Sequence, residues 1–372
     1  MHLQTIRLTN FKNYKSAQLD FSAQINCFLG NNGSGKTNLL DAIYYLSLTK
    51  SSTSSQDQHC ILHNEPLFAL KGEFSKDEKI REVICGLQLG KKKLVKLDQK
   101  PYRKPSEHVG KFPVVLIAPN DTDVIRGASD LRRKFFDAII AQVDQHYLQT
   151  LIQYNHLIKQ RNSLLKQFAE TGQTDLELLE PFNQQLIDLG TQIFQKRENF
   201  IKEYRALVTR HYQNLTNSAE VIELNYESHF QEDVEELLKQ NLQKDIILKR
   251  SNIGIHKDEF HFVMNGEAIK KFGSQGQQKS YLIALKLAHF DFTEQQTGMK
   301  PLLLLDDIFD KLDDLRISKL MEMVASDAFG QIFITDARPE RTIGLLADDS
   351  HEVELFEVDN GQVKNRSEET SQ

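Results

Sequence analysis

The spacing of apolar residues is strand-like towards both ends of the chain and helical in its middle. Residues 25–29 form an unbroken apolar run that predicts a buried strand, and apolar residues at helical spacing follow over 38–46. Residues 113–117, 302–305 and 331–335 are further runs of the buried-strand type. Because these runs are far apart, we expect an α/β core assembled from distant parts of the chain.

Between these strands the pattern is that of long amphipathic helices. Apolar residues recur at steps of three and four over 136–168, with Arg161 taking one position of the stripe, and this predicts one long helix. A second stripe covers 182–211, after a turn that contains Gly172. Two helices of similar length joined by such a turn predict an antiparallel hairpin, in which the stripes pack against each other.

This helical segment interrupts the α/β part of the chain. We therefore expect a discontinuous domain, with its N-terminal part over residues 1–125 and its C-terminal part over 246–372. Residues 126–245 would form the inserted helical lobe.

A short hairpin with a dense positive charge precedes the helical segment. Residues 82–89 and 94–97 predict two antiparallel strands, and Gly90 to Lys93 form the tip. The lysines either protect a sheet edge from aggregation or contact DNA phosphates. The candidate DNA-binding residues are Lys91, Lys92 and Lys93, with Arg132 and Arg133 in a second cluster at the start of a helix.

Composition sets limits on this picture. A chain of 372 residues, 40% hydrophobic and 26% charged, is long enough for two globular domains. Its apolar runs stay well below 18 residues and its first residues resemble a strand, so we expect a cytoplasmic protein without a membrane partner. The three cysteines are widely spaced, which favours buried free thiols. With a net charge of −6, any nucleic-acid surface must be local.

The segment from Gly30 to Thr37 matches the pattern G-x-x-x-x-G-K-[ST] between a predicted strand and a predicted helix. In this pattern backbone N–H groups wrap a phosphate, Lys36 reaches the outer phosphates and the Thr37 hydroxyl binds Mg²⁺. A glycine-rich turn with an incidental lysine is the alternative, and the flanking strand and helix argue against it. The predicted ATP-binding residues are Gly30, Asn31, Asn32, Gly33, Ser34, Gly35, Lys36 and Thr37.

Two aspartates end the predicted strand of leucines. We expect Asp306 to hold Mg²⁺ through water and Asp307 to polarise the attacking water, so Lys36 and Asp307 are the predicted catalytic residues. A strand that ends in acidic residues is common, and this interpretation depends on the phosphate-binding loop.

A second phosphate-binding end is predicted where Ser274 opens a helix. A helix cap without a ligand is the alternative. The pattern Ser-x-Gly-Gln, placed shortly before the acidic strand, resembles the signature motif of ABC-type ATPases, which completes the nucleotide site of a partner subunit. The resemblance assigns this role in trans to Ser274, Gly276 and Gln277, and it places a D-loop at residues 309–313.

Six segments, in order, together resemble the RecF family of bacterial DNA replication and repair proteins. They are residues 9–14, 30–44, 132–137, 160–166, 256–258 and 273–279. The resemblance implies an α/β fold, an ABC-type (SMC-like) P-loop ATPase head with an inserted α-helical hairpin lobe. It also implies recombinational repair and replication restart by an ATP-dependent homodimer. This dimer would bind double-stranded or gapped DNA, hydrolyse ATP slowly in a DNA-stimulated reaction, and help load RecA with RecR and RecO.

The chain departs from the family at several positions. Lys12 and Lys257 stand where the family usually has arginine, and residues 50–55 replace an arginine-containing stretch, so nucleotide contacts there stay open. Asn120 is the candidate for the polar contact of the Q-loop. Thr335 and Asp336 take the place of the catalytic histidine of transporters, which suggests slow turnover. The alternative is the nucleotide-binding subunit of another ABC system, either a transporter or a nuclease-linked ATPase.

Overall fold

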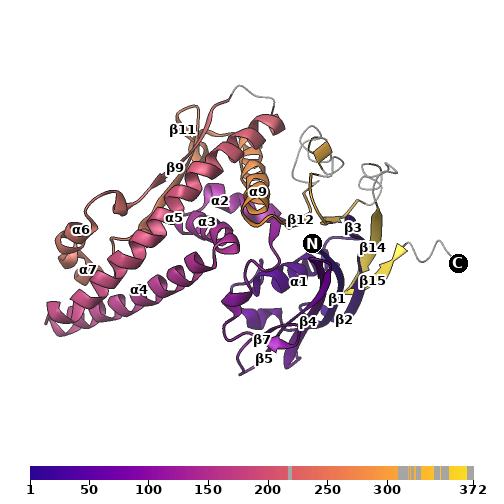
Figure 1. Ribbon diagram of the computed structural model, residues 1–372, viewed down its shortest axis with the longest axis horizontal. Coiled ribbons are helices and arrows are strands. Elements are labelled where there is room, and N and C mark those ends of the chain that lie inside the picture. Colours follow the sequence, from indigo (N-terminus) through magenta and orange to yellow (C-terminus); the bar gives the residue numbers. More distant parts are fainter. Residues whose placement is uncertain are drawn as a thin grey trace. The chain divides into compact units, whose positions relative to one another are not determined.

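The computed structural model describes residues 1–216, 220–308, 328–338 and 352–366, with the single positions 317, 319, 322, 323 and 344. The chain divides into two compact units (Figure 1). Unit 1 consists of residues 1–121, 214–216 and 283–372, and unit 2 of residues 122–213 and 217–282. The division differs from the expected boundary at residue 245, because residues 246–282 group with the helical part. The predicted D-loop, residues 309–313, lies outside the described residues.

The described part of unit 1 contains two sheets of six strands each. The first sheet is antiparallel, in the order β2 (Tyr14–Asp20), β1 (His2–Phe11), β4 (Leu67–Lys76), β5 (Lys79–Gln88), β6 (Leu94–Leu97) and β7 (Lys100–Pro101). The pairing of β5 with β6 confirms the predicted hairpin.

The second sheet is parallel except for its edge strand β15. Its order is β15 (Gln362–Asn365), β14 (Val353–Asp359), β3 (Ile25–Leu29), β13 (Ile332–Asp336), β12 (Leu302–Asp306) and β8 (Val114–Ile117). All five residues of β3, β12 and β13 are buried, as the unbroken apolar runs predicted.

Helix α1 (Lys36–Leu48) contacts strands of both sheets of unit 1. Leu39, Leu40 and Ile43 are buried in a core to which both sheets contribute. This packing explains why α1 is apolar on more than one face. The loop between β3 and α1 consequently lies at the carboxyl ends of the parallel strands, where α/β sheets bind ligands.

The described residues of unit 2 are mainly helical and include one small sheet. Its α-helices are α2 (Thr122–Arg126), α3 (Ser129–Val143), α4 (Gln145–Thr171), α5 (Leu176–Thr216), α6 (Val234–Gln240), α7 (Leu242–Leu248), α8 (Ile269–Phe272) and the start of α9 (Gln275–Thr297). The sheet has the order β11 (Glu267–Ala268), β10 (Glu259–Met264) and β9 (Ile222–Glu227). Short 3₁₀ helices span Asp57–Cys60 (η1), Pro105–His108 (η2) and Pro119–Asp121 (η3) in unit 1, and His229–Gln231 (η4) and Ile255–Lys257 (η5) in unit 2.

The prediction of one helix over residues 136–168 is wrong, because the chain breaks between α3 and α4. Asp144 has an extended backbone, with φ −133° and ψ 99°, and its side chain accepts a hydrogen bond of 2.9 Å from the N–H of Tyr147. This bond is an N-cap, which starts a new helix. At the other end, Gly172 closes α4 with φ 69°, and α5 then runs back beside α4, as the hairpin prediction required (Figure 1).

Arg161 interrupts the apolar stripe because it forms a buried polar junction in unit 2. Its side chain is fully buried and donates to Asp245 (2.7 Å), Ser251 (2.7 Å) and Asn183 (2.9 Å). A buried charge must be paired in this way. The arginine thereby links α4 to α5 and α7.

The three cysteines are buried and free, which confirms that prediction; they are Cys27, Cys60 and Cys85. Among the described residues, none of the helices has both the length and the apolar character needed to cross a membrane.

Candidate nucleotide site

The loop after β3 has a backbone that only glycine can adopt at several positions. Gly33 and Gly35 have φ of 83° and 118°. A Cβ atom on Gly35 would lie 2.5 Å from the Asn13 side chain, and one on Gly30 would lie 2.2 Å from the carbonyl oxygen of Val358. The glycines of the motif therefore serve the packing of the loop as well as the approach of a phosphate.

Lys36 is held inside this loop. Its ammonium group donates to the carbonyl oxygens of Gly30 (2.8 Å) and Asn31 (2.9 Å). Burial lowers the pKa of Lys36, and the nearby carboxylates of Asp307 and Asp306 oppose that shift. The lysine is thus bound to the backbone of its own loop in this structure.

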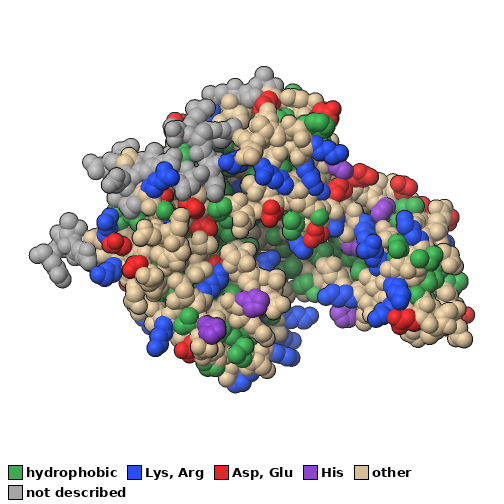
Figure 2. Space-filling view, turned by 180° about the vertical axis from the view of Figure 1, so that it is seen from behind, with side chains coloured by type: hydrophobic (Ala, Val, Ile, Leu, Met, Phe, Trp, Pro, Cys, Tyr) green, Lys and Arg blue, Asp and Glu red, His purple; other side chains and the backbone are tan. Residues whose placement is uncertain are grey.

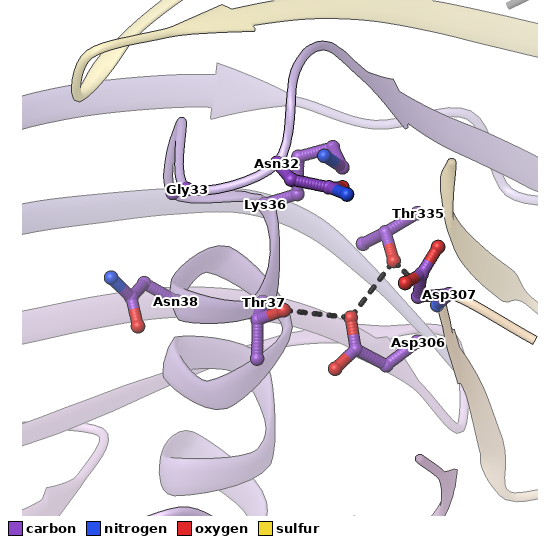
Figure 3. A pocket seen from close by; sticks show the side chains of 9 residues that line it. Asn32, Gly33, Lys36, Thr37, Asn38, Asp306, Asp307 and Thr335 are labelled. Carbon is purple, nitrogen blue, oxygen red and sulfur yellow. Dashed lines mark hydrogen bonds between the residues drawn. The ribbon is translucent and has the colours of Figure 1, made fainter. Parts of the chain in front are cut away.

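Asp306 joins the first turn of α1 to the neighbouring strand. Its Oδ1 accepts hydrogen bonds from Thr37 (2.9 Å) and Thr335 (2.8 Å), and the Thr335 hydroxyl also accepts from the N–H of Asp307 at 2.9 Å (Figure 3). Burial raises the pKa of Asp306, while the two hydroxyl groups oppose the shift. The oxygen donors of Thr37 and Asp306 fit the ligand preference of Mg²⁺.

These side chains face one cavity of about 210 Å³. It is lined by Asn32, Gly33, Gly35, Lys36, Thr37, Asn38, Asp306, Asp307 and Thr335. The structure thus gathers the predicted catalytic and metal-binding residues in one place. Asn38 was not predicted as a site residue, and Thr335 was noted only for taking the place of a transporter's catalytic histidine. The hydrogen bond of Thr335 to Asp306 was not expected.

Three residues whose nucleotide contacts the sequence left open do not line this cavity; they are Lys12, Asn120 and Lys257. The ammonium of Lys12 is 2.6 Å from Asp41, a buried residue of α1 that also accepts from Ser51. Asn120 is exposed in η3 and does not line the cavity. Lys257 belongs to unit 2. In this structure Lys12 therefore pairs with α1 and does not project into the cavity.

The predicted signature residues form a helix cap in unit 2. Ser274 Oγ accepts from the N–H of Gln277 at 3.2 Å, and Gln277 Oε1 accepts from the N–H of Ser274 at 2.7 Å. This reciprocal pair is a capping box at the start of α9, with Gly276 inside its first turn.

The candidate DNA-binding residues differ in how far their charges are neutralised. Lys91 and Lys92 are exposed at the hairpin tip. Lys93 pairs with Asp57 at 2.7 Å and Arg132 with Glu259 at 2.8 Å, while Arg133 donates to the backbone oxygen of Asp258. On the face drawn in Figure 2, basic side chains are interspersed with acidic ones. Lys91 and Lys92 are the better candidates for phosphate contacts.

Residues 2–361 match the family described as the RecF/RecN/SMC N terminal domain. A protein of Flavobacterium johnsoniae named "DNA replication and repair protein RecF" is 46% identical over 359 residues, which cover 96% of this chain and 100% of that protein. The chain belongs to the RecF family. A RecF protein of Cytophaga hutchinsonii is 46% identical over 365 residues, covering 98% of this chain and 97% of its own.

Solved structures agree with the family. The RecF–ATPrS structure described as the recombination mediator of the RecFOR pathway has a TM-score of 0.89 at 29% identity, and covers 98% of both chains. The corresponding RecF–ATP structure has a TM-score of 0.86 at 30% identity, covering 98% of this chain and 97% of that one. An Smc head domain from Pyrococcus furiosus, at 17% identity and a TM-score of 0.56 over 100% of this chain and 97% of its own, shares the fold. The predicted fold class, an SMC-like ABC ATPase head, is confirmed.

Proposed function

We propose that this chain is an ATP-dependent DNA-binding switch of recombinational repair and replication restart, in which ATP brings two copies together. The observation that carries the proposal is the cavity that joins the loop lysine Lys36 to Thr37 and Asp306. The names of the relatives support the repair role, and the titles of two solved relatives specify ATP or ATPrS.

The residues of the cavity have different roles toward the nucleotide. Lys36 releases its carbonyl partners and binds the outer phosphates, while Thr37 and Asp306 hold Mg²⁺. When bound, Mg²⁺ neutralises phosphate charge. Thr335 keeps the Asp306 carboxylate in place, and Asp307 orients the attacking water and accepts its proton.

The second half of each site comes from the other copy. Ser274, Gly276 and Gln277 of one copy bind the γ-phosphate held by the other, since a helix start stabilises an anion. Slow hydrolysis, stimulated by DNA, then limits the life of the dimer. The dimer binds duplex or gapped DNA, with Lys91 and Lys92 on phosphates, and acts with RecR and RecO in loading RecA.

The test is the size of the protein in solution. Light scattering after gel filtration should give a monomer without nucleotide and a dimer with Mg-ATP. Lys36→Ala should stay monomeric with ATP, because the phosphates lose their loop cation. Lys15→Ala, which removes an exposed lysine of β2 in the same unit, is the matched control and should dimerise normally. ATP-driven dimerisation of Lys36→Ala at wild-type concentrations would refute the composite site.

A further inference from the structure

The amide of Gln277 is part of a polar chain that extends beyond the signature motif. Gln277 Nε2 donates to the carboxylate of Glu220 at 2.6 Å, and the other oxygen of Glu220 accepts from the Tyr212 hydroxyl at 2.5 Å. Gln277 Oε1 meanwhile accepts from the N–H of Ser274. Both ends of the Gln277 amide are therefore engaged inside unit 2.

Hydrogen bonds of the residues that follow Glu220 hold this part of the chain in place. The next residue, Val221, exchanges hydrogen bonds with Asn265, by its N–H at 3.0 Å and its carbonyl oxygen at 2.8 Å. Three residues along, the carbonyl oxygen of Glu223 accepts from Tyr281 at 2.7 Å, and Tyr281 is a fully buried residue of α9 one turn beyond Gln277. The strand that begins here, β9, is thus tied to the same helix that the signature motif starts.

The charge of Glu220 is of the same sign as the ligand proposed for this helix end. A helix start favours a single anion, and two anions at one helix end repel each other. The carboxylate also accepts a hydrogen bond from the amide of Gln277, one of the residues that the proposed function places against the phosphate. Charge-assisted hydrogen bonds are roughly twice as strong as neutral ones, so the release of Gln277 opposes phosphate binding.

We propose that Glu220 is a positioning residue that holds the signature motif in its self-capped form and so raises the ATP concentration at which two copies join. Tyr212 supports the carboxylate from α5. This inference rests on the proposed function, in which the signature motif binds the ATP of a second copy. ATP binding by a single copy takes place in the cavity of unit 1 and is independent of Glu220.

The experiment compares Glu220→Gln with the wild-type chain in two titrations. The midpoint of ATP-driven dimerisation should fall about three- to tenfold in the variant, because a neutral amide holds Gln277 less strongly and does not repel phosphate. Binding of a fluorescent ATP analogue by the dilute monomer should not change. Tyr212→Phe should shift the dimerisation midpoint in the same direction by a smaller factor.

The matched control is Glu235→Gln, which removes an equal charge from an exposed ion pair with Lys239 in the same unit. It should leave both midpoints unchanged. A dimerisation midpoint in Glu220→Gln equal to or above that of the wild type would overturn the proposal, and so would an equal shift in the control.

Hydrogen exchange separates this inference from the proposed function. In nucleotide-free protein, Glu220→Gln should speed exchange of the Ser274 N–H, which Gln277 Oε1 protects. Unchanged exchange would overturn the positioning role, even if ATP does not dimerise the wild-type chain. Failure of the wild type to dimerise would instead refute the proposed function.

Discussion

The side chain of Asp306 connects two strands and a helix of the nucleotide site. It ends β12, receives the hydroxyl of Thr37 from α1 and receives the hydroxyl of Thr335 from β13. Asp307 follows directly, with a left-handed backbone at φ 47°. Asp306 holds two hydroxyl donors on one carboxylate oxygen, which suits it for the proposed metal role, and Asp307 is the carboxylate proposed for the water.

Replacing Asp307 by asparagine should separate binding from turnover. The amide cannot accept the proton of the attacking water, so we expect ATP hydrolysis to slow by about 100-fold or more. Mg-ATP binding should persist through Thr37 and Asp306, and the ATP-bound dimer should live longer. Single-turnover hydrolysis and the decay of the dimer measure the two effects. Turnover at the wild-type rate would remove Asp307 from the catalytic role.

His108 should make unit 1 sensitive to acid. It is fully buried, with Nε2 lying 2.8 Å from the carbonyl oxygen of Leu46, and burial lowers its pKa to about 4. Below about pH 6.5 His108 binds a proton in the unfolded chain but stays neutral in the folded chain. The free energy of unfolding therefore falls as the pH drops towards 4. At pH 5 the neutral state of this histidine should lower the free energy of unfolding by about 2 kcal/mol relative to pH 7.

Thermal unfolding at pH 7 and pH 5 tests this expectation. His108→Gln should narrow the difference in melting temperature between the two pH values. Part of the difference should remain, because burial lowers the pKa of other histidines as well. His63→Gln, at an exposed position of the same unit, should not alter the difference. A difference as large in His108→Gln as in the wild type would contradict the assignment.

At the residue scale, the place of Lys36, Thr37, Asp306 and Asp307 around one cavity could be predicted, because the loop motif is local in the sequence and a buried strand ends at the two aspartates. Their roles in binding and hydrolysis stay predictions. Thr335 could not, since its contact with Asp306 depends on the order of strands in the sheet. For Ser274, the sequence allowed two interpretations, ligand binding or a helix cap. The structure shows the cap, with reciprocal hydrogen bonds between Ser274 and Gln277.

At the element scale, the hairpin of β5 and β6 presents exposed lysines at its tip. Changing Lys91 and Lys92 together to glutamine should weaken duplex DNA binding in the ATP state and leave ATP affinity unchanged. Each phosphate contact contributes about 0.9 to the slope of log affinity against log salt, so the slope should flatten by roughly 2. Titrations of labelled duplex at several salt concentrations measure it.

Light scattering of the free protein provides the second readout. If the lysines only protect a sheet edge, DNA affinity and slope will stay normal and aggregation will rise. Changing Lys15 and Lys79 together to glutamine is the control for an equal loss of charge, because both lysines are exposed in strands of the same unit, away from the tip. Lys93 is left intact because its ion pair with Asp57 supports the unit.

Elements were predictable where periodicity and turn chemistry agreed. The β5–β6 hairpin and the turn at Gly172 satisfied both conditions. The break at Asp144 could not be predicted, because the apolar stripe continues across it. The cap is a single hydrogen bond from the N–H of Tyr147 to the Asp144 side chain. The ion pair of Lys93 with Asp57 could not be predicted either, because it joins residues of separate elements that are far apart in the sequence.

At the scale of the whole molecule, the nucleotide loop depends on a hairpin from the far end of the sequence. The N–H of Gly361, in the turn between β14 and β15, donates to the carbonyl oxygen of Ser34 at 3.1 Å. Gly361 has φ 76°, and a Cβ atom there would lie 2.6 Å from the carbonyl oxygen of Asn13. The β14–β15 turn therefore lies directly against both the loop and the backbone of Asn13.

Gly361→Ala should push this hairpin away from the loop. We expect a loss of about 1–3 kcal/mol in stability and weaker ATP binding, since backbone must move to admit the methyl group. Gly266→Ala is a matched control, because its φ of 81° imposes similar strain in open space. It should lower stability slightly and leave ATP affinity unchanged. Equal ATP affinity in both variants would show that the hairpin does not support the site.

The two-unit organisation was only partly visible in the sequence. The interruption of the α/β core by a helical segment followed from periodicity alone. The assignment of residues 246–282 to unit 2 did not, because β10 pairs with β9 and a strand pair of this kind is not encoded by either strand alone.

The strand order of the second sheet determines when this protein can become functional during its synthesis. β3 is made early, yet Ile25 pairs with Ile332 on one side and with Val353 on the other. A nascent chain on the ribosome must carry an apolar strand without its neighbours until those late segments emerge. Such unpaired strands invite aggregation and fold slowly, so newly made chains should depend on chaperones for most of translation. The loop after β3 also lacks its contact with the β14–β15 turn until these late segments are made.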